Sequence, residues 1–121
     1  LYNAVGWGAY DENISQKALE NTFYSVSIYD KDKIIGYGRL IGDNICFMYI
    51  HDIMVLPEYQ YKGIGTMIMK YLLKKLNELK EENPNLRVYL GASKNKEKFY
   101  EKFGFIKRID ANLGYGMILK S

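Results

Sequence analysis

The sequence predicts a layered α/β (α+β) fold in which helices flank a mixed sheet. Three observations support this class. Short apolar runs alternate with stretches of helical periodicity, turn residues separate them, and the 121 residues suffice for one packed core. Since 48% of the residues are hydrophobic and no repeat or low-complexity linker interrupts them, we expect a single domain over residues 1–121.

The first half of the chain predicts two helices, a hairpin and a long strand. The helices are expected over residues 1–9 and 11–23. FYSVSIYD and IIGYGRLIG then predict a hairpin, with the polar turn running from Asp30 to Lys33. ICFMYIHDIMVL is almost continuously apolar, which is typical of a strand in the centre of a sheet, and Pro57 ends it.

The second half predicts two helices and three strands. From Gly63 onward apolar residues recur at helical spacing until Asn83 and Pro84 end the helix. Residues 87–92 predict the next strand, and NKEKFYEKFGF predicts a short helix closed by Gly104 in a left-handed conformation. FIKRI and GYGMILK are expected to form the last two strands.

Charge and composition argue against several classes of protein. The 17 Lys and Arg residues are scattered among 14 acidic ones, without the basic cluster that nucleic-acid binding favours. No run approaches the ~20 apolar residues that span a bilayer, and no charged leader opens the chain. The single cysteine, Cys46, lies in an apolar run, where we expect a buried thiol. These features predict a cytoplasmic protein that binds neither nucleic acid nor membrane. Because the sequence opens on Leu1 instead of Met, a missing N-terminal first strand stays an open alternative.

The stretch LPEYQYKGIGTMIMKYLLKKL places two glycines where a helix begins, although glycine weakens a helix. Backbone amides from about Tyr61 to Thr66 would point out of this helix start, with the positive end of the helix dipole behind them. Gly63 and Gly65 would allow a ligand to approach the backbone, and Lys62 would add charge. The stretch therefore predicts a site for a phosphate group.

Common nucleotide motifs do not fit this stretch. It lacks the Walker pattern, and Ile68 stands where a dinucleotide fingerprint needs its third glycine. Q-Y-K-G-I-G instead matches Q/R-x-x-G-x-G/A, V-L-P precedes it, and F-Y-E-K-F-G-F follows at residues 99–105. With these motifs, nearly the whole chain resembles the GCN5-related N-acetyltransferase (GNAT) superfamily.

Other segments refine the resemblance. AVGW, IGYGRLIGDN and GYGM resemble a subgroup of small bacterial acetyltransferases and, more loosely, plant arylalkylamine acetyltransferases. One departure is that Ser93 and Lys96 stand where the superfamily often has Asn-x-x-Ala. The resemblance implies a mostly antiparallel, twisted sheet with a splayed central pair of strands, and it allows a homodimer formed through edge strands.

The resemblance also implies acetyl coenzyme A as cosubstrate, without a metal. Pantetheine would bind the backbone of Ile53, Met54 and Val55, and one of these amides would polarise the thioester carbonyl. The pyrophosphate would bind at the turn and helix start formed by Gln60, Tyr61, Lys62, Gly63, Ile64, Gly65 and Thr66.

Acetyl transfer to an amine requires a neutral nucleophile and a stabilised leaving thiolate. Tyr100 matches the tyrosine that the superfamily places near the sulfur. Since the ordinary pKa values of a phenol and a thiol are about 10 and about 8.5, full protonation of the thiolate is uphill by roughly 2 kcal/mol. We therefore expect Tyr100 to donate a hydrogen bond to the thiolate.

His51 and Asp52 are both candidates for the base that accepts the amine proton. Strand alternation groups His51 with Tyr49 and Ile53 on one face, and Asp52 with Met54 on the other, unless a bulge intervenes. An imidazole, with an ordinary pKa near ~6.5, suits the role slightly better.

Together these features predict an N-acetyltransferase that moves the acetyl group of acetyl coenzyme A to the amine of a small molecule by direct attack in a ternary complex. Two alternatives stay open: a module that binds or senses acyl coenzyme A with little catalysis, and an acetyltransferase acting on protein termini or lysines. Arg39 lies inside an apolar strand pattern, where its charge requires a partner such as a carboxylate or the acceptor.

Overall fold

The computed structural model describes residues 22–120, which divide into two compact units between Tyr89 and Leu90. The helices predicted over residues 1–9 and 11–23 lie outside the described residues, apart from Thr22 and Phe23. These two residues are not helical and lead into the first strand. Whether residues 1–121 behave as one domain stays a prediction.

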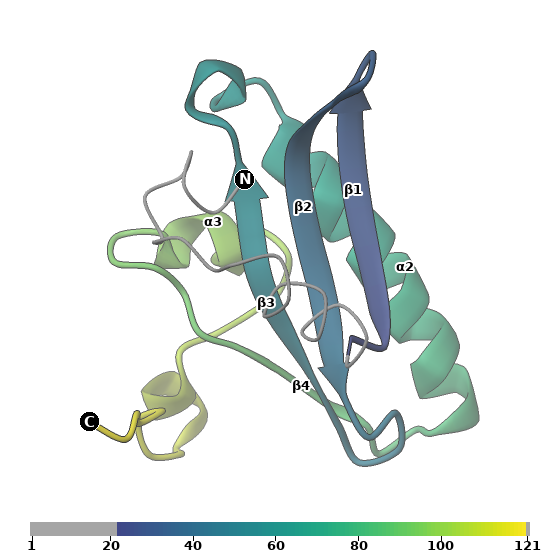
Figure 1. Ribbon diagram of the computed structural model, residues 1–121. Helices are drawn as coiled ribbons and strands as arrows, with labels where there is room; N and C mark the ends of the chain where they lie inside the picture. Colours follow the sequence, from purple (N-terminus) through teal and green to yellow (C-terminus); the bar gives the residue numbers. More distant parts are fainter. Residues whose placement is uncertain (1–21, 121) are drawn as a thin grey trace. The chain divides into compact units, whose positions relative to one another are not determined.

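The first unit is built on a four-stranded mixed sheet in the order β1-β2-β3-β4 (Figure 1). β1 (Tyr24–Asp30) and β2 (Lys33–Gly42) form the predicted antiparallel hairpin, in which Asp30 pairs with Lys33 across a two-residue turn. β3 (Phe47–Val55) pairs antiparallel with β2. The run ICFMYIHDIMVL therefore supplies an inner strand, as predicted.

β4 (Arg87–Leu90) lies on the other side of β3. The backbone N–H of Arg87 donates to the carbonyl of Cys46 at 3.0 Å, next to the start of β3. The splay predicted for this pair of strands stays a prediction.

α2 (Ile64–Glu82) packs its apolar side against the sheet and ends at Asn83, as predicted. Its fully buried side chains contribute on the order of 1.5–3 kcal/mol each; they are Ile68, Met69, Leu72 and Leu76. The helix lies so close to β2 that a Cβ atom added at Gly38 would be 2.7 Å from Cγ2 of Ile68. Gly38 is thus required in β2 because a side chain at this position would collide with α2.

The turn between β2 and β3 is organised by Asp43. Its Oδ1 accepts hydrogen bonds from the backbone N–H groups of Ile45, Cys46 and Phe47 at 2.9, 2.7 and 3.0 Å. These three donors, that of Phe47 first, lower the pKa of the carboxyl group because they favour its charged form. The expected burial of Cys46 is wrong, because the thiol belongs to this exposed turn and β3 begins one residue later.

The second unit contains α3 (Glu97–Glu101) and the 3-10 helix η2 (Arg108–Ala111). Gly104 has φ +94°, which confirms the left-handed conformation expected after α3. The ring of Phe99 packs edge-on against those of Tyr100 and Phe103, with centroids 5.1 and 5.4 Å away.

The two strands predicted from FIKRI and GYGMILK are wrong. Residues 105–107 have no regular structure, η2 occupies Arg108–Ala111, and residues 113–120 form no strand. A strand needs a neighbour that satisfies its N–H and C=O groups, and within the described residues the sheet contains only β1–β4. β-forming composition is therefore insufficient here. In the part of the chain that the structure describes, no helix combines the length and the hydropathy needed to cross a membrane.

Candidate active site

A β-bulge in the middle of β3 shapes the candidate site. Asp52 and Ile53 stand opposite the single residue Gly38, because the register slips between the pairs Tyr37–Met54 and Arg39–His51. Asp52 adopts φ +58°, a left-handed conformation that aspartate tolerates better than most residues. A bulge of this kind redirects the side chains that follow it.

The bulge reverses the alternation of side chains along β3. A Cβ atom on Gly38 would lie 2.6 Å from Cδ1 of Ile53 and 2.7 Å from Ile68 of α2, so Ile53 faces the helix. Met54 pairs with Tyr37, whereas His51 pairs with Arg39, two residues further along β2. Ile53 therefore does not share a face with His51, because the bulge that the sequence analysis allowed for interrupts the regular alternation.

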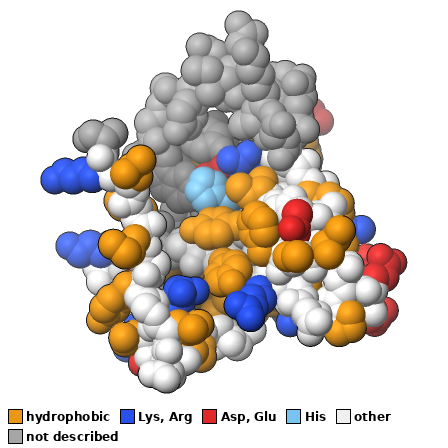
Figure 2. All heavy atoms as spheres, turned by 90° about the horizontal axis from the view of Figure 1, so that it is seen from below, with side chains coloured by type: hydrophobic (Ala, Val, Ile, Leu, Met, Phe, Trp, Pro, Cys, Tyr) orange, Lys and Arg blue, Asp and Glu red, His pale blue; other side chains and the backbone are white. Residues whose placement is uncertain are grey.

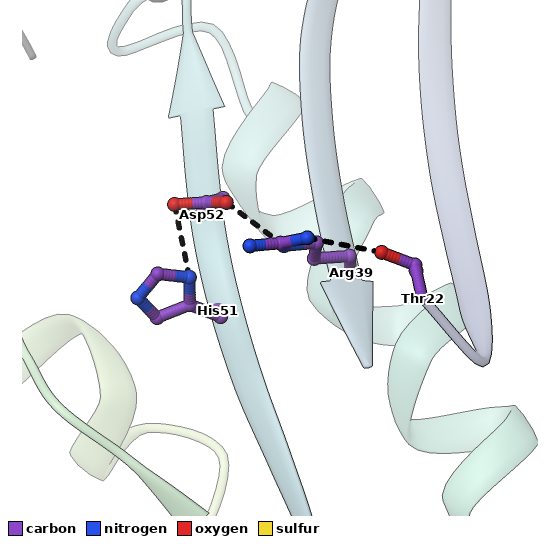
Figure 3. Close-up of polar contacts among 4 residues, drawn as sticks. All are labelled: Thr22, Arg39, His51 and Asp52. Atoms are coloured by element: carbon purple, nitrogen blue, oxygen red, sulfur yellow. Dashed lines mark hydrogen bonds and ion pairs between the residues drawn. The ribbon is translucent and has the colours of Figure 1, made fainter. Parts of the chain in front are cut away.

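Asp52 holds together a polar network across β2 and β3 (Figure 3). Its Oδ2 forms an ion pair with Nε of Arg39 at 2.8 Å, and its Oδ1 lies 3.0 Å from Nδ1 of His51. Nη1 of Arg39 donates to Oγ1 of Thr22 at 3.0 Å. The sequence predicted that the charge of Arg39 needs a partner such as a carboxylate, and the structure identifies the carboxylate of Asp52 as that partner.

The members of this network differ sharply in exposure. The side chain of Asp52 is 5% exposed and that of Arg39 is 14% exposed, whereas that of His51 is 48% exposed. Figure 2 shows the imidazole at the molecular surface. The structure thus brings together the two predicted base candidates, but only His51 is open to a second molecule.

Sequence reasoning missed Tyr37. It lies two residues before Arg39 on β2, which places both side chains on one face, and it is 9% exposed. Burial raises the pKa of its phenol, and Arg39 acts in the opposite direction. The sequence did contain a signal, because Tyr37 stands two residues before a charged residue within a predicted strand. That signal is easy to overlook in a chain with 12 tyrosines.

The turn that follows β3 leads directly into α2. η1 (Pro57–Tyr59) comes first, and the side-chain amide of Gln60 then donates to the carbonyl of Val55 at 2.9 Å. Tyr61 and Gly63 both adopt left-handed conformations, with φ of +63° and +83°. Gln60 therefore fixes the shape of the turn with its side chain, and its coenzyme contact stays a prediction.

The start of α2 has the properties of an anion site. The first bond of the helical ladder runs from the N–H of Met67 to the carbonyl of Gly63, so three amides precede it, those of Ile64, Gly65 and Thr66. No side chain caps this end, and the first turn carries no acidic residue. A Cβ atom added at Gly63 would meet nothing within 4 Å. Exposed Lys62 adds positive charge nearby. This arrangement fits a phosphate group.

Tyr100 belongs to the second unit, in α3. Burial raises the pKa of its phenol, which therefore stays protonated to higher pH than usual. Its place beside a thioester sulfur stays a prediction, as do the coenzyme contacts of Ile53, Met54 and Val55. Among residues 22–120, no three His, Cys, Asp or Glu side chains gather in a way that could hold a metal ion.

Comparison with known proteins identifies the family. Residues 2–114 match the model of the acetyltransferase (GNAT) domain, so the chain belongs to this family. An uncharacterised ycf52-like N-acetyltransferase of Prochlorococcus marinus is 31% identical over an alignment of 109 residues that covers 87% of this chain. The chain spans 58% of the length of that relative.

Solved structures show the same fold. A protein of unknown function from meticillin-resistant Staphylococcus aureus, described as a probable acetyltransferase, superimposes with a TM-score of 0.86 and 34% identity over 100% of this chain and 88% of its own. A GNAT-family acetyltransferase from Streptococcus pneumoniae gives a TM-score of 0.75 and 27% identity over 100% and 86%. Family membership implies acetyl coenzyme A as the acetyl donor.

Proposed function

We propose that this chain catalyses transfer of the acetyl group of acetyl coenzyme A to the amine of a small molecule, by direct attack in a ternary complex. The GNAT domain over residues 2–114 supports the acetyl donor and the reaction class. A basic side chain at the bulge of β3 supports an amine acceptor, and a helix start suited to phosphate supports the coenzyme.

The observation that carries the proposal is the arrangement of His51 and Asp52. Each carboxylate oxygen of Asp52 lies next to a partner, Oδ2 next to Arg39 and Oδ1 next to His51. The side chain of Asp52 is only 5% exposed. Asp52 is thus poorly placed to take a proton from a second molecule. His51 directs Nδ1 toward Asp52 and is half exposed, so its Nε2 is the atom that accepts the amine proton.

The proton matters because amines are protonated at neutral pH. For a lysine-like amine with pKa about 10.4, forming the neutral nucleophile at pH 7 costs about 4.6 kcal/mol. In the proposed reaction, the ammonium group first gives one proton to Nε2 of His51. The neutral amine nitrogen then bonds to the carbonyl carbon, the carbon–sulfur bond breaks, and the nitrogen releases its second proton to solvent. The leaving thiolate then takes a hydrogen bond from the Tyr100 phenol, whose raised pKa keeps it a donor.

Coenzyme binding is assigned to the turn after β3. The amides of Ile64, Gly65 and Thr66, with Lys62, would hold the pyrophosphate, and the backbone of residues 53–55 would hold pantetheine. The bound coenzyme would supply the thioester. The protein would supply fixed backbone donors that need no rearrangement when charge develops.

The test is release of free thiol from acetyl coenzyme A in the presence of a panel of small amines. His51→Ala should lower kcat most near neutral pH, where a neutral imidazole can accept the amine proton, and least in acid, where an imidazole is already protonated. Glu78→Gln on the exposed side of α2 serves as the matched control. A His51→Ala profile superimposable on the parent would rule out the base role. Tight coenzyme binding without turnover on any amine would favour a sensing module, and turnover on peptides alone would favour a protein acetyltransferase.

A further inference from the structure

Arg39 is held on two sides by fixed partners. Nε of Arg39 lies 2.8 Å from Oδ2 of Asp52, and Nη1 donates to Oγ1 of Thr22 at 3.0 Å, in the segment just before β1. Figure 3 shows the guanidinium lying between these partners, on the side of Asp52 away from the imidazole. A buried guanidinium held in this way has little freedom to swing toward a ligand.

The bulge in β3 makes this contact possible. Arg39 and His51 are direct partners across β2 and β3, so their side chains share one face. In a regular strand Asp52 would face the other side of the sheet. Its φ of +58° and the extra residue opposite Gly38 instead bring the carboxylate between Arg39 and His51.

The contact fixes what the carboxylate can do. A guanidinium beside a carboxylate favours its charged form, whereas burial alone would favour the protonated one. A charged carboxylate only accepts hydrogen bonds, so Oδ1 of Asp52 requires a proton on Nδ1 of His51. The lone pair of the neutral imidazole then lies on Nε2. A protonated Asp52 could instead donate to Nδ1, which would place the ring proton on Nε2 and remove the acceptor.

We propose that Arg39 is a positioning residue for acetyl transfer: through Asp52 it keeps His51 in the tautomer with the proton on Nδ1, so that Nε2 is free to take the proton of the amine. This inference rests on the proposed function, because it assigns Arg39 a role in the base that the reaction uses. Arg39 itself touches neither substrate in this scheme.

The tautomer can be measured directly because His51 is the sole histidine of the chain. In ¹⁵N-labelled protein, the two imidazole nitrogen shifts report which nitrogen carries the proton, and they are measured at about pH 8.5, well above the ordinary imidazole pKa of ~6.5. The wild type should show the proton on Nδ1. Arg39→Gln, which removes the charge but keeps a polar side chain, should shift the population toward the proton on Nε2. Arg39→Lys, which retains the charge, should restore the wild-type signals.

Kinetics provide the second readout. Arg39→Gln should reduce kcat on the order of tenfold to hundredfold, the range expected when a catalytic group loses its proper placement, with the dissociation constant for acetyl coenzyme A unchanged. Arg87→Gln, at an exposed arginine of β4, is the matched control and should leave both readouts at wild-type values. Should Arg39→Gln fail to fold, Thr22→Val tests the same point, because it retains the ion pair and removes the second anchor of the guanidinium. It should shift both readouts in the same direction by a smaller amount.

The outcomes separate the two proposals. If His51→Ala is slow but the tautomer and kcat of folded Arg39→Gln match the wild type, the role of Arg39 is overturned and the base survives. The same holds for Thr22→Val where it is the variant that folds. If the wild type itself carries the proton on Nε2, or His51→Ala turns over at the parent rate, the proposed base fails first.

Discussion

The bulge at Asp52 and the helix start at Gly63 are both built on left-handed backbone, yet they satisfy their polar groups in opposite ways. At the bulge, the buried carboxylate has its oxygens next to Arg39 and His51. At the helix start, a Cβ atom added at Gly63 would meet nothing within 4 Å, and no side chain caps the first amides. The first region is completed by the protein itself. The second is suited to completion by an anionic ligand, so substitutions should affect stability at one and binding at the other.

The largest expected effect is on stability at the bulge. Asp52→Asn keeps a residue that tolerates positive φ but leaves the buried guanidinium of Arg39 without its carboxylate. Removal of one member of a buried ion pair typically costs about 3–5 kcal/mol of unfolding free energy. Denaturant titration measures this loss, with Asp110→Asn at an exposed position of η2 as the control. A loss no larger than that of the control would show that the bulge does not depend on the pair.

The next largest effect should be on binding at the helix start. Gly63→Asn and Gly63→Asp both tolerate the left-handed conformation and differ only in charge. A negative charge 4 Å from a phosphate costs between about 1 and 4 kcal/mol, depending on the local dielectric. The aspartate variant should therefore bind coenzyme A at least about fivefold more weakly than the asparagine variant, by calorimetric titration.

The same pair of variants controls for folding. A negative charge at the start of a helix favours the helix dipole, so Gly63→Asp should be at least as stable as Gly63→Asn. High salt should narrow the difference in affinity between them. Equal affinities at low salt would remove the assignment of phosphate to this turn.

Turnover should fall when Tyr100, which lies outside both regions, is replaced. Tyr100→Phe removes a hydrogen-bond donor and should lower kcat about tenfold to hundredfold, or roughly 1.4–2.8 kcal/mol, with coenzyme affinity nearly intact. Since burial raises the pKa of Tyr100, the phenol remains a donor up to and beyond pH about 10, its ordinary value. The deficit of the variant should thus persist across the neutral and mildly alkaline range of a pH–rate profile. A variant that turns over at the wild-type rate would reduce Tyr100 to a packing residue.

The smallest effect is expected at Asp43, where backbone donors meet an exposed carboxylate. Its pKa is lowered in the folded state, so its contribution to stability is present above the ordinary carboxyl pKa of about 3.9 and is lost as the pH falls through the lowered value. Asp43→Asn should be slightly less stable than the wild type near neutral pH. The two should converge in acid, as thermal melts over a pH series would show.

Sequence patterns predicted the first unit well and the second poorly. The hairpin, the inner strand and α2 follow from local periodicity and turn residues, because each buries an apolar face within a short stretch. The last two predicted strands failed because a strand depends on a partner elsewhere in the chain. The exposed residues Tyr115, Met117, Ile118 and Leu119 have the composition of a strand and no ladder within the described residues.

For the candidate site, the sequence by itself determined which residues are candidates for the chemistry: the glycines and lysine at the helix start, the sole histidine and its acidic neighbour, and the motif around Tyr100. Only the tertiary structure decided which contacts His51 and Asp52 make and which of the two is exposed. Strand alternation placed them on opposite faces, and the bulge opposite Gly38 overrides that period of two. The pairing of Arg39 with Asp52 joins residues 13 positions apart in the chain across two strands, with a register that no local pattern specifies.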